Sequence, residues 1–199
     1  IETITRYVKE DPKRSSIHHP TYNAPHYPLH AKPADIAKYR GKYKMGWEEM
    51  RKQRYQRQVE MGLIDPKRYP LTDTDSDAYD WETADQDFED HRMAVYAAMM
   101  DCVDQNIGRL LQSLKDLKVY DNTLIIFLSD NGGCAEEPGG RDPALRNPGP
   151  VDDYVALGPA WGWAQNAPFR RHKSWLQEGG SNTPMIAWWP GKIKANTLT

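Results

Sequence analysis

An apolar repeat between residues 93 and 117 constrains the fold of this chain more than any other feature. Apolar side chains recur there at alternating intervals of three and four residues: Met93, Tyr96, Met100, Val103, Ile107, Leu110, Leu114 and Leu117. This spacing places all of them on one face of an α-helix of about seven turns. We expect a long helix packed against a sheet, and a coiled coil is the alternative that the spacing leaves open.

Two short apolar runs follow the predicted helix. Residues 123–128 are apolar and β-prone throughout, which is typical of a strand buried on both faces. A second run, 185–189, is closed by Pro190 and Gly191. A long helix followed by buried strands predicts an α/β protein with a helix-covered, largely parallel β-sheet.

The rest of the chain divides into polar segments. Residues 1–35 predict an opening helix followed by a Pro- and His-rich loop, and residues 47–61 predict a polar helix. Residues 134–172 are rich in Pro and Gly, which predicts a long surface loop rather than a second domain. We therefore expect residues 1–199 to belong to a single domain.

Residues 72–90 carry nine carboxylates and no Lys or Arg. The spacing of three of them matches the start of an EF-hand calcium loop: Asp73, Asp75 and Asp77. However, Ala78 and Ala84 stand where that loop needs Gly and Glu. We therefore expect a solvated acidic loop.

The composition argues against two classes of protein. Its 26 basic and 28 acidic residues give a formal net charge of −2, without the basic excess typical of nucleic-acid-binding proteins. No apolar run approaches the roughly 20 residues of a transmembrane helix.

The chain begins at Ile1 without a signal-peptide pattern, so we expect a processed or excised piece. Cys102 and Cys134 fit neither a disulfide framework nor a CxxC metal site, and Cys102 is expected in the helix core.

The end of the first predicted strand is a candidate site, because ligands of α/β sheets collect beyond the carboxyl ends of strands. Asp130 and Asn131 offer hard oxygen donors there, which suit Ca²⁺ or Mg²⁺. Gly132 and Gly133 allow a close backbone approach. A simple turn without a ligand is the alternative, and the residues alone leave both open.

Two further places offer chemistry. The run Arg170, Arg171, His172 and Lys173 could hold an oxyanion such as sulfate or phosphate, or it could be a solvated surface. His26 lies in a loop stiffened by neighbouring prolines, which suits a positioned proton donor as well as a structural histidine.

Four motifs in the same order resemble those of the type I sulfatases, and bacterial arylsulfatases are the closest look-alikes. Residues 124–133 resemble that family's metal-binding strand end, and residues 93–111 resemble the helix before it. Residues 24–30 resemble its Pro-His-x-Pro loop. Residues 173–180 resemble its Lys-x-x-x-x-Glu-Gly-Gly segment, which is followed, as in the family, by a strand and Trp-Pro-Gly.

This resemblance implies the alkaline-phosphatase-like α/β/α fold, present here as a partial catalytic domain, and cleavage of sulfate esters with bound Ca²⁺ in preference to Mg²⁺. By position, Asp130 and Asn131 would be metal ligands. Lys173 would contact the sulfate, and His26 would face the ester or leaving-group oxygen. The implied partner is a sulfated small molecule or carbohydrate, and the implied location is periplasmic or secreted.

The chain also departs from the family pattern. The family's formylglycine nucleophile arises in a Cys/Ser-x-Pro-x-Arg motif, but Cys102 and Cys134 lack the Pro and Arg that should follow. We expect this motif upstream, because the chain resembles the middle-to-later part of the catalytic domain. Residues 15–22 are polar where the family has an apolar strand. Because the nucleophile motif is missing, we expect the chain to be inactive alone.

Two other functions stay open at this point. One is a related metal-dependent phosphodiesterase or phosphonate hydrolase, which shares the chemistry of the strand end. The other is a non-catalytic carbohydrate-binding remnant that uses its Trp and Tyr side chains.

Overall fold

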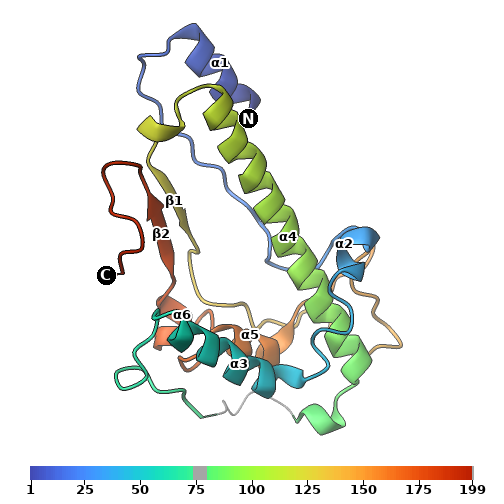
Figure 1. The fold of residues 1–199 in the computed structure, drawn as a ribbon. Helices are drawn as coiled ribbons and strands as arrows, with labels where there is room; N and C mark the ends of the chain where they lie inside the picture. Colours follow the sequence, from blue (N-terminus) through green and yellow to red (C-terminus); the bar gives the residue numbers. More distant parts are fainter. Residues whose placement is uncertain (74–79, 199) are drawn as a thin grey trace.

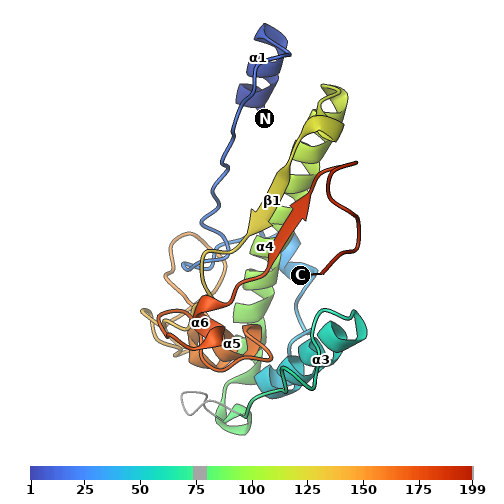
Figure 2. The same cartoon turned by 90° about the vertical axis from the view of Figure 1, so that its left-hand side faces the viewer.

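The computed structural model describes residues 1–73 and 80–198 (Figure 1). Its elements, in chain order, are α1 (Glu2–Glu10), α2 (Pro33–Ala37), α3 (Gly46–Glu60), η1 (Trp81–Thr83), α4 (Gln86–Asp116), η2 (Tyr120–Asn122), β1 (Ile125–Leu128), α5 (Gly158–Gln165), α6 (Glu178–Ser181) and β2 (Met185–Trp188). The two strands lie to one side of α4, and α3, α5 and α6 gather at the end of the molecule opposite α1 (Figures 1 and 2). The expected opening helix and polar helix are confirmed as α1 and α3.

The predicted long helix is confirmed as α4, which begins seven residues before Met93. Asp85 caps it by accepting a 2.9 Å hydrogen bond from the backbone N–H of Phe88, and acidic residues in the first turn suit the helix dipole. Burial is deepest in the N-terminal half, at Ala94, Val95 and Ala98. These small side chains let neighbouring segments approach α4 closely.

A cluster of tryptophans forms the centre of the core. Trp47 of α3 and Trp161 of α5 are fully buried and meet edge to face, with ring centroids 5.6 Å apart. Trp81 packs edge to face on Trp47 at 4.8 Å. The aromatic contacts therefore join three elements that are distant in sequence.

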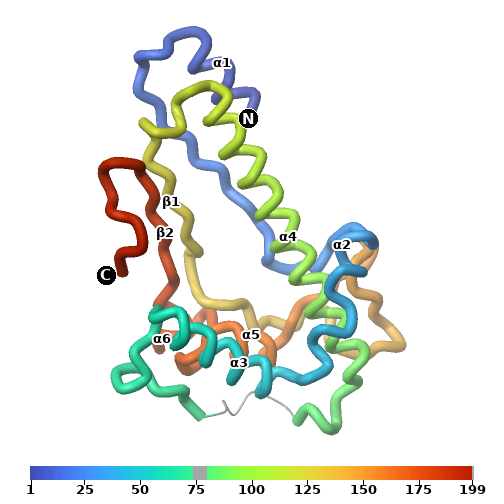
Figure 3. The backbone as a smooth tube through the Cα atoms, in the orientation of Figure 1, coloured from blue at the N-terminus to red at the C-terminus, as the bar shows by residue number. Residues whose placement is uncertain are grey.

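The expectation of a surface loop over residues 134–172 is wrong for the part from residue 155 onward, whereas residues 134–154 form no helix or strand. This segment contains α5, and Val155–Leu157 and Trp161 are buried in the core. The tube in Figure 3 runs from β1 past α4 toward α2 and returns to α5. Backbone hydrogen bonds hold this path: Gly149 N–H donates to Leu29 O at 3.1 Å, and Leu29 N–H donates to Val155 O at 2.9 Å. The frequent Pro and Gly residues obscure a short apolar stretch that supplies part of the core.

The acidic segment 72–90 is also only partly a solvated loop. Asp75 and Asp77 lie outside the described residues, but Glu89 and Asp90 belong to α4 and are buried. Asp90 accepts hydrogen bonds from Arg40 and from two backbone N–H groups. Glu89 accepts from Arg92 and from the indole of Trp161, while burial raises its pKa. Buried carboxylates persist where such partners are present.

The sheet differs from the predicted one. β1 and β2 pair antiparallel, in a register that runs from Ile125 opposite Trp188 to Leu128 opposite Met185. β1 is not buried on both faces, because Ile126 and Leu128 are 51% and 54% exposed. In the described part of the chain, each of these strands has only the other as a paired neighbour. A largely parallel sheet is therefore not seen in residues 1–73 and 80–198.

None of the described helices combines the length and apolar character needed to cross a membrane.

Candidate active site

The His26 loop is held in place by the segment that returns toward α5. The backbone bonds of Leu29 to Gly149 and Val155 fix one end of this loop. The His26 side chain is exposed, and its Nδ1 lies 2.9 Å from the carbonyl oxygen of Tyr27. Because a carbonyl only accepts, Nδ1 carries the proton in this contact, which leaves Nε2 as an acceptor in the neutral ring.

Lys173 reaches this histidine from the other side. Its Nζ lies 2.9 Å from His26 Nε2, although the two residues are 147 positions apart in sequence. An ammonium group only donates, so this contact again requires Nε2 to accept. The backbone N–H of Lys173 donates to Gly133 O at 3.0 Å, which ties the lysine to the loop that follows β1.

Glu136 joins the same cluster and was not predicted from the sequence. Its carboxylate accepts a short hydrogen bond from the Tyr27 hydroxyl and lies 3.4 Å from Lys173 Nζ. The hydrogen bond from Tyr27, together with the nearby ammonium of Lys173, holds the pKa of Glu136 below its ordinary value. The same hydrogen bond raises the pKa of Tyr27 to about 12. Only two weak features of the sequence pointed to this pair: Tyr27 is adjacent to His26, and Glu136 lies in the loop that follows β1.

The turn that follows β1 is hydrogen-bonded to the segment around α6. Gly132 N–H donates to Gly180 O at 3.0 Å, and a Cβ atom built on Gly132 would collide with the carbonyl oxygen of Gly179. Gly133 N–H donates to Asn166 Oδ1 at 2.9 Å. These contacts bring the Asp130–Gly133 turn beside the Lys173–Gly180 segment. Asp130 is exposed and Asn131 is half-buried.

Asp130 and Asn131 fit part of a calcium site. Their oxygens are the hard donors that Ca²⁺ prefers, and their turn extends from the carboxyl end of β1. Among residues 1–73 and 80–198, Asp130 belongs to no group of three metal-binding side chains. Since Ca²⁺ takes six to eight oxygens, these two residues would supply a minority of its ligands.

The predicted cationic run does not act as one group. Arg171 stacks on Trp175, with its guanidinium 4.3 Å from the ring centroid. His172 is buried, and its Nδ1 lies 3.2 Å from the carbonyl oxygen of Lys173. Lys173, by contrast, projects toward His26.

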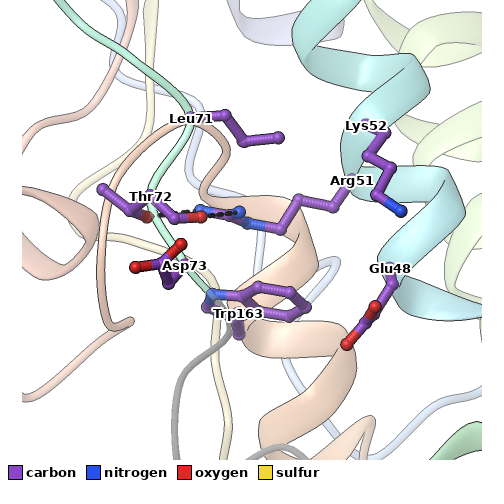
Figure 4. Close-up of a pocket in the computed structure, with 7 residues that line it drawn as sticks. All are labelled: Glu48, Arg51, Lys52, Leu71, Thr72, Asp73 and Trp163. Carbon is purple, nitrogen blue, oxygen red and sulfur yellow. Dashed lines mark hydrogen bonds between the residues drawn. The ribbon is translucent and has the colours of Figure 1, made fainter.

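A pocket of about 230 Å³ lies between α3, residues 71–73 and Trp163 of α5 (Figure 4). Arg51 extends from α3 across it and donates to Thr72 O and Pro168 O at 2.6 and 3.0 Å, while its guanidinium lies 4.2 Å from the Trp163 ring centroid. Its hydrogen bond to Pro168 connects α3 to the chain segment that leads to Lys173. None of the residues lining this pocket is a predicted site residue.

Comparison with known proteins identifies the class of the chain. The family model for sulfatases matches residues 2–198. An arylsulfatase of Klebsiella aerogenes is 32% identical over 98% of this chain and 46% of its own length. An uncharacterised sulfatase of Schizosaccharomyces pombe is 35% identical over 89% of this chain and 35% of its own length. The human N-acetylgalactosamine-6-sulfatase is 34% identical over 49% of this chain.

The chain belongs to the sulfatase family. Family membership implies the alkaline-phosphatase-like α/β fold, to which the described residues contribute helices and an antiparallel strand pair. The chain spans less than half the length of these curated relatives.

Proposed function

We propose that the protein carrying this chain hydrolyses sulfate esters, and that His26 and Lys173 act on the ester. The observation that carries this proposal is the 2.9 Å contact between Lys173 Nζ and His26 Nε2 beside the strand end. Two groups able to bind an oxyanion and to move a proton thus converge at one point. Membership of the sulfatase family supports sulfate rather than phosphate as that oxyanion.

In this proposal the two side chains have different roles. Lys173 donates hydrogen bonds to the non-bridging sulfate oxygens, so its contact with His26 opens when the ester binds. His26 Nε2 then faces the bridging oxygen and, once protonated, donates a proton to the departing alkoxide. The nucleophile is proposed to be the family's formylglycine, contributed by an upstream motif that these 199 residues do not contain.

We also propose that the protein binds a calcium ion. Asp130 and Asn131 would hold the ion, which when bound supplies positive charge next to the sulfate. Calorimetric titration of Ca²⁺ into the full-length protein and into Asp130→Ala tests this assignment. We expect weaker binding to the variant, and equal affinities would remove Asp130 from the site.

The proposal also extends to the substrate class and the location. We propose a sulfated small molecule or carbohydrate as substrate and a periplasmic or secreted location, because both follow from the resemblance to bacterial arylsulfatases.

Replacement of Lys173 by Ala tests the function. In the full-length protein, Lys173→Ala should lower kcat/KM for an aryl sulfate about 10²-fold or more, whereas Lys192→Ala, at an exposed lysine, should leave it unchanged. Melting temperatures should stay close to that of the wild type. Preferential hydrolysis of a phosphodiester or a phosphonate ester by the wild type would contradict the proposal and favour the related phosphoryl hydrolases.

A further inference from the structure

Three side chains of different chemistry converge beside Lys173. A ring nitrogen of His26, the Sγ atom of Cys134 and a carboxylate oxygen of Glu136 all lie within 4.8 Å of one another. Imidazole, thiolate and carboxylate are the three ligand types that Zn²⁺ takes in proteins. A hard ion such as Ca²⁺ takes oxygen ligands instead, so the metal preference of this group differs from that of Asp130 and Asn131.

Two members of the group already contact a positive charge. Lys173 Nζ lies 2.9 Å from His26 Nε2 and 3.4 Å from the Glu136 carboxylate. The lone pair of Nε2 and the charge of the carboxylate are therefore both directed at a cation. Hydrogen bonding of Nδ1 to the Tyr27 carbonyl fixes the ring in the tautomer that leaves Nε2 free to ligate, as is usual for metal-binding histidines.

We propose that His26, Cys134 and Glu136 form a site for a borderline-soft divalent cation such as Zn²⁺, which displaces Lys173 and leaves a fourth coordination position open. Glu136 and His26 are exposed and Cys134 is half-buried, so an ion reaches the ligands without opening the core. The consequence rests on the proposed function: an ion bound here removes both His26 and Lys173 from the ester and therefore inhibits hydrolysis.

Cobalt binding to the full-length protein tests the site independently of activity. With Co²⁺ as the probe, in a thiol-free reductant, we expect a thiolate-to-cobalt charge-transfer band that Zn²⁺ removes and an excess of Ca²⁺ does not. Cys134→Ser should abolish the band, whereas the matched Cys102→Ser should retain it. Glu136→Gln should weaken Co²⁺ binding at least about tenfold, and Asp130→Ala should not change it.

Several outcomes overturn the site. These are the absence of the band in the wild type, its survival in Cys134→Ser, its loss in Cys102→Ser, or unchanged affinity in Glu136→Gln. Because Glu136 is exposed, its variant tests the site even if Cys134→Ser fails to fold, which circular dichroism would reveal.

Inhibition is measured on the full-length protein. Zn²⁺ should inhibit sulfate-ester hydrolysis by the wild type, and Cys134→Ser should require at least about tenfold more Zn²⁺. An active enzyme that saturating Zn²⁺ leaves uninhibited would contradict the blocking role. If the protein hydrolyses no sulfate ester at all, the proposed function fails, while the cobalt titration still decides the metal site.

Discussion

At the scale of single residues, the candidate site is a chain of hydrogen bonds and one ion pair. It runs from the Tyr27 hydroxyl through Glu136 and Lys173 to His26, which is bonded back to the Tyr27 backbone. Each contact fixes the position of the next side chain. Sulfate-ester chemistry would use the last two members of this chain.

Replacing His26 should affect substrates unequally. In the full-length protein, His26→Ala should slow cleavage of a sulfated sugar roughly 10²–10⁴-fold, the usual worth of general acid catalysis. An activated aryl sulfate should lose far less, because its good leaving group needs no proton. Kinetics of both substrates with one well-folded preparation provide the measurement. Equal losses would mean that His26 is not the acid.

Replacing Tyr27 should change how stability depends on pH. A carboxyl whose pKa is lowered by folding contributes stability above its unfolded value, near 4.3 for Glu, and loses it as the pH falls through the folded value. Tyr27→Phe removes the main cause of the lowered Glu136 pKa. The melting temperature of the variant should lie at most a few degrees below that of the wild type at pH 7, because Glu136 is exposed, and the gap should narrow toward pH 3. A gap independent of pH would count against this linkage.

At the scale of elements, a helix could be predicted from the sequence where the residues that determine it lie in one continuous stretch. The apolar repeat of α4 lies in one continuous stretch, so the helix could be predicted from the sequence. The burial of α5 depends on contacts with Trp47 and Trp81, which are more than 70 residues away. Glu136 was not predicted for the same reason, since its partners Tyr27 and Lys173 are distant from it in sequence. Asp130, Asn131, Lys173 and His26 were assigned by resemblance, and their roles remain predictions.

Two glycines give a matched test of the strand-end packing. Gly132→Ala should destabilise the protein by about 1–3 kcal/mol, because its methyl group would push the β1 end away from Gly179. Gly108 lies within α4 with no atom near its added methyl group, so Gly108→Ala should stabilise by about 0.5–1 kcal/mol. Urea unfolding of both variants measures the difference. Equal effects of the same sign would contradict the close approach.

At the scale of the whole molecule, the described chain holds part of a sulfatase. It contributes a tryptophan-centred core, the His26 and Lys173 pair and two candidate calcium ligands. The apolar side chains of β1 and β2 are largely exposed, as expected if other segments of the family's sheet cover them.

The 199-residue chain alone should therefore show neither complete function nor tight calcium binding. It lacks the Cys/Ser-x-Pro-x-Arg motif, so a rigorously pure sample should not turn over an aryl sulfate. Its calcium affinity should be weaker than that of the full-length protein, because ligand charge and number set affinity. Sustained turnover by the chain, or equal calcium affinity, would refute this view of its role.

The central proposal is that His26 and Lys173 act together on one sulfate ester. A double-mutant cycle on the full-length protein measures this, with kcat/KM for a sulfated sugar determined for the wild type, His26→Ala, Lys173→Ala and the double variant. Each single change should cost about 10²-fold or more. The double variant should be only slightly slower than the worse single variant, because groups that act as a unit are not additive. Losses that multiply, or single variants as active as the wild type, would contradict the claim.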